Sequence, residues 1–357
     1  MRIAVIGLGL IGGSIGLAAR ERLEAQTMGW DLDPSALAAA AARGAIDVQS
    51  RSIAQALDGA DAAFVAAPVG ALPELIGEVL RHAPDTCVVT DVGSTKRVVV
   101  DGQDDQRFVG GHPLAGAETS GIGHARADLF DGATWYLTPT ATTSGILYER
   151  LYRLLSRLGA RPIAIDAADH DAILALVSHL PHVLANVLVD QAATALGADG
   201  ERLPATGPSF RDATRVAGAN SSIWTDIYLS NHDALTAAID ATIDRLGSVR
   251  SALIAGDEAG IRQWNDDAAR ARRRLAGAEL ASGADLHELR VAVPNQPGVV
   301  AQIALELGRA GVNIADLALH PAPSMTEGVV ALWLAGVDTA ARAEEVISGL
   351  GFQVFRP

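Results

Sequence analysis

The sequence predicts three successive domains: an α/β domain with a mainly parallel sheet, an all-α domain and a small α+β domain. Through the first 166 residues, apolar strand-like runs alternate with helix-like segments, which is the pattern of a sheet with helices on both faces. From residue 167 to about 276 the periodicity is helical and strand punctuation is missing. Residues 286–357 then follow the order strand, helix, strand, strand, helix, strand.

The strand signal of the predicted first domain, 1–166, lies in seven apolar runs. These runs are 2–7, 25–31, 60–68, 85–93, 107–112, 134–139 and 160–166. The long apolar helices of the second domain, 167–276, exceed what the first domain needs as cover, so we expect a helical dimer core. The stretch GAELASGAD at 277–285 is small and polar and is predicted to be a linker to the last domain.

A glycine-rich turn follows the first strand-like run and opens a helix. Gly7, Gly9 and Gly12 have the spacing GxGxxG, which provides a tight turn, close approach to a pyrophosphate and close packing of the helix on the strand. The N–H groups at the start of that helix would face the phosphates. The predicted cofactor site comprises Gly7, Gly9, Leu10, Ile11, Gly12, Asp31, Ala67 and Pro68.

Asp31, at the end of the second strand-like run, indicates which dinucleotide binds. It lies nineteen residues past Gly12, where a carboxylate accepts a hydrogen bond from a ribose 2′-hydroxyl and repels a 2′-phosphate. We therefore expect NAD rather than NADP. The alternative is a solvated turn residue or a cap on the next helix, although Asp33, directly before Pro34, is the better cap.

Composition disfavours several classes of protein. The net charge of −14 opposes binding to nucleic acid or anionic lipid. We expect no membrane span, because no run of eighteen apolar residues occurs, and no signal peptide, because the chain begins in a strand pattern. Cys87 is the only cysteine, which excludes a disulfide framework and fits a cytoplasmic protein.

Two polar residues follow strand-like runs in the first domain: Ser94 in TDVGSTK and His112 in VGGHPLAG. In open α/β sheets ligands bind at the carboxyl ends of the strands, so both side chains could face the nicotinamide end of a cofactor. The glycines before His112 and Pro113 after it restrict the backbone in a way that an idle loop histidine would not need. The alternative for Ser94 is a helix N-cap.

The motifs GLGLIGGSIGLA, DVGSTK, GGHPLAGAETSG, SHLPH and FRDATRVA occur in an order and spacing that resemble the prephenate dehydrogenases, over roughly residues 1–275. The tail resembles an ACT domain, chiefly through PNQPGVVAQIALELGRAGVNI. The resemblance implies a homodimeric enzyme of tyrosine biosynthesis that oxidatively decarboxylates prephenate to 4-hydroxyphenylpyruvate with NAD. The alternative substrate is arogenate, which would give tyrosine directly.

The resemblance also implies residue roles. His112 is the base for the C4 hydroxyl proton as hydride leaves, a task that suits a neutral imidazole, and Ser94 bonds the same hydroxyl or orients the imidazole. Arg215 binds the ring carboxylate, unless it only pairs with Asp212. His182 contacts the substrate side chain. The remaining substrate-binding candidates are Arg211, Glu118, Ser120 and His179.

Glu118 bears on the choice of substrate, because a carboxylate could favour the ammonium of arogenate over the keto group of prephenate. It could equally be a loop residue paired with an arginine.

His179 and His182 have a spacing that would suit a metal pair, but no HExxH pattern or nearby acidic residue supports one, so we expect no metal.

The ACT-like tail offers a second candidate site, for a tyrosine or phenylalanine effector. Gly298 leaves the start of the first helix accessible to an anion, and Asn313 offers an amide in the turn that leads into Ile314. The alternative is that the module only adds dimer interface.

Two other functions remain open. A β-hydroxyacid dehydrogenase typically uses a lysine of its helical domain, whereas the only lysine here, Lys96, lies in the first domain. A non-catalytic sensor of dinucleotide and amino acid would not need His112, Ser94 and Arg215 together.

Overall fold

The computed structural model describes residues 1–357 apart from 117–118, 197–206, 279–285, 323–326 and 357. Contacts within the chain divide it into two compact units, which we call the first unit and the second unit. The first unit comprises Met1–Asp171, Gly218–Ser230 and His287–Pro357. The second unit comprises Ala172–Ala217 and Asn231–Leu286.

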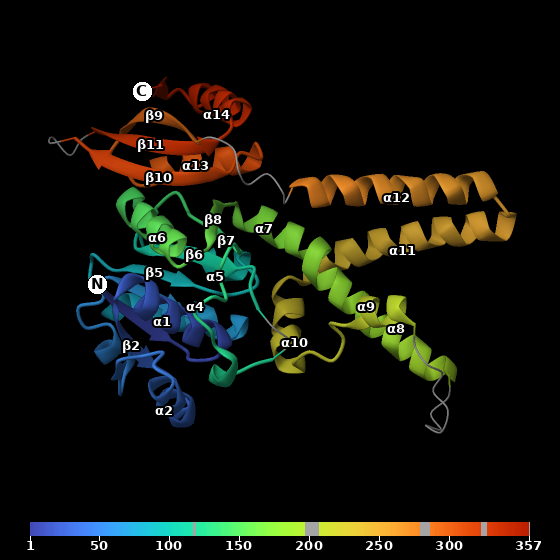
Figure 1. Cartoon of the computed structure of the whole chain (residues 1–357), viewed down its shortest axis with the longest axis horizontal. Coiled ribbons are helices and arrows are strands. Elements are labelled where there is room, and N and C mark those ends of the chain that lie inside the picture. The colour runs from blue at the N-terminus through green and yellow to red at the C-terminus, as the bar shows by residue number, and fades with distance from the viewer. Residues whose placement is uncertain (117–118, 197–206, 279–285, 323–326, 357) are drawn as a thin grey trace. The chain divides into compact units, whose positions relative to one another are not determined.

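The larger sheet of the first unit is formed, within the described residues, by eight strands (Figure 1). These are β1 (Arg2–Ile6), β2 (Gln26–Trp30), β3 (Val48–Gln49), β4 (Ala62–Val65), β5 (Val88–Asp91), β6 (Phe108–Pro113), β7 (Thr134–Thr138) and β8 (Arg161–Ala164). Their order is β3-β2-β1-β4-β5-β6-β7-β8, and neighbours run parallel except β6 and β7. Seven strands overlap the runs expected from the sequence, and β3 is too short to carry a sequence pattern.

Both faces of this sheet are covered. Alternate side chains of a strand point to opposite faces, and on β1 Ile3 and Val5 lie in one apolar core while Ala4 and Ile6 lie in another. The first core is completed by α1 (Leu10–Leu23), α2 (Pro34–Ala42) and α6 (Gly145–Arg157), and the second by α3 (Ile53–Ala56), α4 (Leu72–His82) and α5 (Arg97–Val100). This double cover explains why the strand runs are apolar throughout.

The second unit is helical. One long helical segment begins with α7 (Ala167–Leu174), which starts in the first unit, and passes through a π-helical turn at Ala175–His179. The turn lies just before Pro181, which has no N–H to donate to the helix. The other helices of this unit are α8 (Leu180–Leu196), α9 (Pro208–Thr214), α11 (His232–Ala255) and α12 (Glu258–Ala278).

The predicted fold class is confirmed, while two details differ from the predicted boundaries. The helix α10 (Ser221–Ser230), expected in the helical domain, packs on the 3₁₀ turn Val69–Ala71 and belongs to the first unit. The helix α12 continues to Ala278, so Gly277 and Ala278 of the predicted linker 277–285 are helical. The rest of that stretch lies outside the described residues. Helical periodicity identifies a helix but does not say which neighbour it packs on.

The C-terminal module, by which we mean the described residues from 286 onward, has the predicted order of strands and helices. It comprises β9 (Leu286–Pro294), α13 (Val299–Arg309), β10 (Ile314–Pro321), β11 (Glu327–Ala335), α14 (Val337–Gly349) and β12 (Gln353–Phe355). The four strands form a second sheet in the order β10-β11-β9-β12, with antiparallel pairing of β10 with β11 and of β12 with β9.

This module packs on α6, one of the helices that cover the larger sheet, and its apolar core is continuous with the core beneath that helix. The Tyr152 hydroxyl on α6 donates to the Ile314 carbonyl at 2.6 Å. Arg309, the last residue of α13, lies 3.5 Å from an Asp166 carboxylate oxygen and 3.7 Å from one of Asp169. The module is therefore held against both α6 and the start of α7.

Candidate active site

The glycine-rich turn between β1 and α1 has three glycines with three different surroundings. Gly7 has φ +94°, and a Cβ there would stand 2.2 Å from the Ala66 carbonyl oxygen. A Cβ on Gly12 would stand 1.9 Å from the Gly7 carbonyl oxygen. At Gly9, by contrast, the described residues place no atom within 4 Å of that position apart from Gly9 itself and its neighbours along the chain. Gly7 and Gly12 are thus required by the fold, and Gly9 leaves open space above the turn.

The start of α1 is suited to a phosphate group. Gly9 is its N-cap, and among the described residues no side chain caps the helix there. Backbone N–H groups at an uncapped helix start bind anions. Leu10 and Ile11 begin the helix, half-buried, and Ala67 and Pro68 follow β4 at the neighbouring strand end.

Asp31 directly follows β2 and holds the glycine turn. Its carboxylate accepts the N–H of Leu8 at 2.6 Å and the N–H of Asp33 at 2.8 Å. Asp33, not Asp31, caps α2, because its side chain accepts the N–H of Ser35 at 2.8 Å. The cap alternative for Asp31 is therefore wrong.

His112 lies near the end of β6 and is buried, with 8% of its surface exposed. The preceding Gly111 is held from both sides: its N–H donates to Asp91 at 2.9 Å, and its carbonyl accepts from the Lys96 ammonium at 2.7 Å. Lys96 and Asp91 form a fully buried ion pair. A Cβ on Gly111 would stand 2.6 Å from the Thr90 hydroxyl, so glycine is required at this position.

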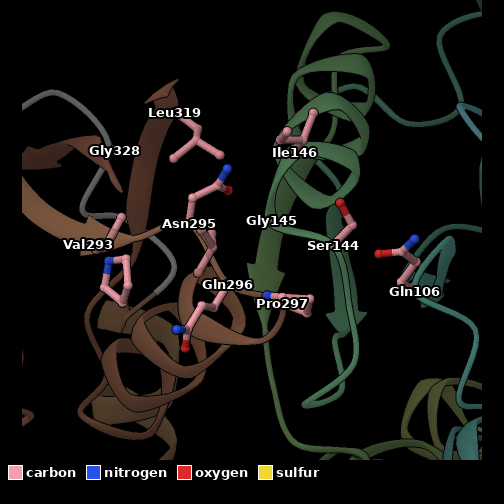
Figure 2. Close-up of a pocket in the computed structure, with 12 residues that line it drawn as sticks. Gln106, Ser144, Gly145, Ile146, Val293, Asn295, Gln296, Pro297, Leu319 and Gly328 are labelled. Atoms are coloured by element: carbon pink, nitrogen blue, oxygen red, sulfur yellow. The ribbon is translucent and has the colours of Figure 1, made fainter. Parts of the chain in front are cut away.

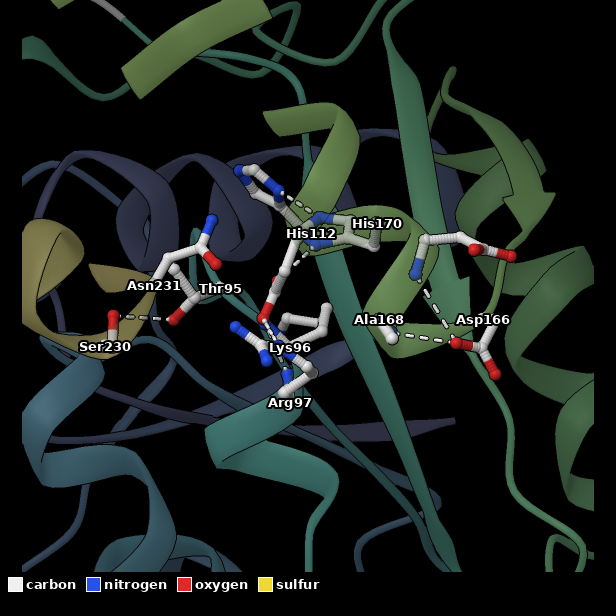
Figure 3. Close-up of polar contacts among 12 residues, drawn as sticks. Thr95, Lys96, Arg97, His112, Asp166, Ala168, His170, Ser230 and Asn231 are labelled. Atoms are coloured by element: carbon white, nitrogen blue, oxygen red, sulfur yellow. Dashed lines mark hydrogen bonds and ion pairs between the residues drawn. The ribbon is translucent and has the colours of Figure 1, made fainter. Parts of the chain in front are cut away.

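The ring of His112 is held by a second histidine on α7 (Figure 3). His112 Nδ1 lies 2.9 Å from His170 Nε2, and His170 Nδ1 lies 2.8 Å from Asp171 Oδ1. We call these three side chains the relay. Burial would raise the pKa of Asp171, but hydrogen bonds from His170 and from the backbone N–H groups of Arg97 and Lys96 leave this pKa below its ordinary value.

The sequence alone does not place His170, Asp171 or Lys96 among the predicted site residues. The histidines of the relay are 58 positions apart in the sequence, so no local pattern connects them. The only available signal was the dipeptide His170-Asp171 at the start of a helix. Lys96 entered the sequence argument only as the one lysine of the chain.

Ser94 lies half-buried in the loop between β5 and α5. It is not the N-cap of α5, because that helix begins at Arg97 after Lys96. The Asp171 carboxylate takes the capping position instead, accepting the N–H of Lys96 at 2.7 Å and that of Arg97 at 3.0 Å. The N-cap alternative for Ser94 is therefore wrong.

The other candidate of this loop region is Ser120, which is exposed in the segment after β6. Glu118 lies outside the described residues.

Two candidate substrate residues of the second unit lie in the long helical segment. His179, in the π-helical turn, is 1% exposed, and its Nδ1 lies 3.2 Å from the amide nitrogen of Asn231. His182 is 5% exposed, and the amide of Asn186 donates to its carbonyl at 2.8 Å. Burial lowers the pKa of His182 below its ordinary value. No cluster of three or more His, Cys, Asp or Glu residues able to hold a metal occurs in the described part of the chain.

Arg211 and Arg215 belong to α9 and its C-terminal end in the same unit. Both side chains are exposed, and they are four residues apart, on one face of the helix. Two guanidinium groups raise the positive potential locally in a chain whose net charge is −14.

The nucleotide turn, the acidic residue after β2 and a buried, hydrogen-bonded histidine near the carboxyl end of β6 define a Rossmann-fold oxidoreductase with a helical second part. Comparison with known protein families identifies the family of oxidoreductases to which the chain belongs. Residues 15–164 match "Prephenate dehydrogenase, nucleotide-binding domain", and residues 166–265 match "Prephenate dehydrogenase, dimerization domain". The chain belongs to the prephenate dehydrogenase family.

Individual relatives agree. The chain is 31% identical to the prephenate dehydrogenase of Bacillus subtilis, over 97% of this chain and 95% of that protein. The structure of prephenate dehydrogenase from Aquifex aeolicus, in complex with hydroxyphenyl propionate and NAD+, is 28% identical and has a TM-score of 0.72 over 77% of this chain and 98% of that one. Synechocystis arogenate dehydrogenase is 27% identical, with a TM-score of 0.67 over 77% of this chain and all of that one.

Proposed function

We propose that this protein catalyses the NAD+-dependent oxidative decarboxylation of prephenate to 4-hydroxyphenylpyruvate, in tyrosine biosynthesis. The observation that carries the proposal is the placement of His112, buried near the carboxyl end of β6 and hydrogen-bonded through its ring and through the neighbouring Gly111. Such a histidine is an oriented base. The family supplies the substrate on which a base of this kind acts.

The nucleotide turn fits the cofactor. Open space at Gly9 and the uncapped start of α1 would receive the pyrophosphate, and Asp31 would bond the ribose hydroxyls. When bound, NAD+ accepts the hydride. Because the Asp31 carboxylate would repel a 2′-phosphate, we expect a much higher kcat/KM with NAD+ than with NADP+.

In the reaction, His112 accepts the proton of the substrate's C4 hydroxyl while hydride leaves C4 for the cofactor. The bond between the ring and its carboxylate then breaks, CO₂ leaves, and the electron pair of that bond makes the ring aromatic. The oxygen at C4 then takes back the proton that His112 accepted and ends as a phenol hydroxyl. Ser94 is proposed to bond the same hydroxyl or to orient the imidazole.

The second unit contributes proposed substrate residues on the resemblance and on side-chain chemistry. Arg215 is proposed to bind the ring carboxylate, as a guanidinium can do with two parallel hydrogen bonds, and His182 to contact the side chain of the substrate. The further proposed contacts are Arg211, His179, Ser120 and Glu118. Arg215→Ala should mainly raise the KM for prephenate; an effect on kcat alone would place Arg215 elsewhere.

The deciding assay follows NADH absorbance with purified protein, NAD+ and either prephenate or arogenate. We expect higher kcat/KM with prephenate. A preference for arogenate would make the protein an arogenate dehydrogenase, the alternative that the Synechocystis relative represents. The Glu118→Gln variant, measured side by side, shows whether this carboxylate sets the ratio of the two kcat/KM values.

His112→Asn is expected to lower kcat by ~10²–10⁴-fold, because a general base typically contributes this much. Binding of NAD+ and prephenate, measured by calorimetry on the same variant, should persist. A kcat near that of the wild type would end the assignment of His112 as the base.

The competing oxidoreductase class fits poorly. A β-hydroxyacid dehydrogenase would need an accessible lysine as its acid or base, and Lys96, the only lysine of the chain, is fully buried in its ion pair with Asp91. A sensor without activity would show binding of NAD+ and no NADH formation.

We propose that the second unit forms a homodimer. Large apolar side chains are exposed on its helices, which is more apolar surface than a monomer normally shows to water. These are Leu176, Val177, Val187, Leu188, Ile243, Leu246, Leu253 and Ile254.

The helical stretch Ala167–Ala195 is also long and apolar enough to span a membrane, because an 18-residue window within it has a mean hydropathy of 1.9. A second copy of the chain accounts for its exposed face without a membrane, and a cytoplasmic location remains our prediction. Light scattering on the purified protein should give twice the mass of one chain.

We propose that the C-terminal module is an ACT domain that binds tyrosine or phenylalanine. Support comes from a cavity of about 210 Å³ beside the turn that leads from β9 into α13 (Figure 2). Asn295 and Gln296 of that turn line it on one side, and Gln106 and Ser144 line it on the other.

Of the three effector residues expected from the sequence, Gly298 lies next to the cavity-lining Pro297 and donates its N–H to the Thr143 carbonyl at 2.9 Å. That amide is already bonded and does not offer an anion site. Asn313 is exposed, and the carbonyl of Ile314 accepts from Tyr152.

Inhibition by tyrosine in the wild type but not in Asn295→Ala would support the effector proposal. Equal inhibition of the wild type and the variant would place tyrosine at the active site. If tyrosine bound to neither protein, the module would have only a structural role.

A further inference from the structure

We propose that His170 and Asp171 set the tautomer of His112, placing its hydrogen on Nδ1 and leaving the lone pair on Nε2. The inference rests on the proposed function, in which His112 is the base. It starts from the two contacts of the relay, 2.9 Å between the histidines and 2.8 Å between His170 and Asp171 (Figure 3).

The hydrogen bonds of Asp171 determine which nitrogen atoms of the relay donate and which accept. Its carboxylate accepts the backbone N–H groups of Lys96 and Arg97 and faces the Arg97 guanidinium at 3.3 Å, so it is ionised and can only accept. His170 Nδ1 must therefore donate to it. A neutral His170 then has only a lone pair on Nε2, and the 2.9 Å contact requires the hydrogen to lie on His112 Nδ1.

The assignment requires a neutral His170, and its surroundings favour that form. Burial lowers the pKa of His170, the bond to the neighbouring carboxylate offsets this in part, and the Lys96 ammonium lowers it again. The ring of Tyr136 packs edge-on, 5.5 Å between centroids, and burial raises the pKa of that phenol, so it is neutral as well. Asp91 pairs with Lys96 and Arg97 with Asp171, and the acidic residues Asp166 and Asp169 lie on the same segment as His170.

The tautomer matters because a neutral imidazole in water favours hydrogen on Nε2. In that form Nε2 would donate a hydrogen bond and could not accept the substrate proton. When His112 takes the substrate proton on Nε2, its Nδ1–H stays bonded to His170, and the charge of Asp171 stabilises the imidazolium. His170 and Asp171 thus act through His112 and are positioning residues.

Two variants separate the two contacts of His170. In His170→Asn the amide stands near the Nδ1 position, can still donate to Asp171 and does not reach His112. In His170→Gln the amide oxygen stands near the Nε2 position and can accept from His112. We expect His170→Asn to lower kcat on the order of 10²-fold with little change in the KM for prephenate, and His170→Gln to recover part of the loss. Equal losses of kcat in the two variants would contradict the proposal.

Nitrogen-15 NMR of the imidazole groups reads the tautomer without any turnover. The His112 signals, identified by their loss in His112→Asn, should show the Nδ1–H form in the wild type and the Nε2–H form in His170→Asn. The same tautomer in both proteins would overturn the inference, whatever the activity of His112→Asn. An active His112→Asn would instead reject the proposed base, so the two failures are distinguishable.

Discussion

At the scale of residues, the site depends on a buried ion pair as much as on its histidines. Lys96 and Asp91 are both fully buried, and together they hold the N–H and the carbonyl of Gly111, the residue before His112. Taking two charges out of water is costly, and burial accordingly lowers the pKa of Lys96 although Asp91 opposes this. The pair is explained by the geometry it imposes on the end of β6.

Removing one partner of this pair should be strongly destabilising. Lys96→Met leaves the Asp91 carboxylate buried without its cation, which typically costs about 3–5 kcal/mol. In the double variant Lys96→Met/Asp91→Asn the amide needs no cation, and its oxygen still accepts the N–H of Gly111, so the loss should be smaller. Urea unfolding of the three proteins measures both values. An equal loss in the single and double variants would show that charge is not the cause.

The relay predicts a pH dependence of stability. Because the pKa of His170 in the fold lies below its ordinary value of 6.5, the unfolded chain binds the proton more readily. The stability is therefore complete above pH 6.5 and falls as the pH drops below it, by at most about 1.4 kcal/mol per pH unit for one group.

His182, whose pKa is also lowered, adds to the same slope. Free energies of unfolding measured at several pH values should decline less steeply in His170→Asn. Parallel curves for the two proteins would mean that His170 is not the titrating group.

At the scale of elements, the β1–α1 turn contains, within six residues, glycines needed for folding and a glycine that we expect to serve cofactor binding. Gly12→Ala places a methyl 1.9 Å from the Gly7 carbonyl oxygen and should lower the melting temperature. Gly9→Ala meets open space, so the protein should fold normally, while the methyl stands where the pyrophosphate must approach and raises the KM for NAD+. Thermal melting and NAD+ titration of both variants test this pair. An unchanged KM for NAD+ in Gly9→Ala would remove the turn from the cofactor site.

The elements themselves could be predicted from the sequence, because periodicity and turn residues are local signals. The sequence also singles out His112, from the glycines and the proline beside it, and its role as the base stays a prediction. The partners of His112 could not, since His170 reaches it only after β6 and α7 have packed together. For the same reason the packing of α10 could not be predicted: its pattern describes a helix and says nothing of the turn at Val69–Ala71 on which it packs.

At the scale of the whole molecule, the C-terminal module is part of the first unit's core. On α13, Gly308 lies so close to β8 that a Cβ would stand 2.3 Å from the Ala164 carbonyl oxygen. Gly308→Val should therefore loosen the docking of the module and lower the melting temperature. Gln302→Val, at an exposed position of the same helix, is the matched control and should melt like the wild type. A similar fall in both variants would assign the effect to helix propensity.

The contact of Arg309 with the start of α7 links the module to the segment that carries His170. One Asp166 carboxylate oxygen caps α7 by accepting the N–H of Ala168 at 2.8 Å, and the other faces Arg309 of the module. His170 stands two residues after Ala168, so the effector proposed above, if it altered the docking of the module, would alter the alignment of His170 with His112.

Thermodynamic linkage concerns binding alone, so an effector that lowered only the rate of proton abstraction would leave the affinity for substrate unchanged, and bound substrate would leave the affinity for the effector unchanged. Inhibition by this route would act on proton abstraction. The rate of the reaction would then fall because kcat is lower, while the enzyme stays saturated with its substrate.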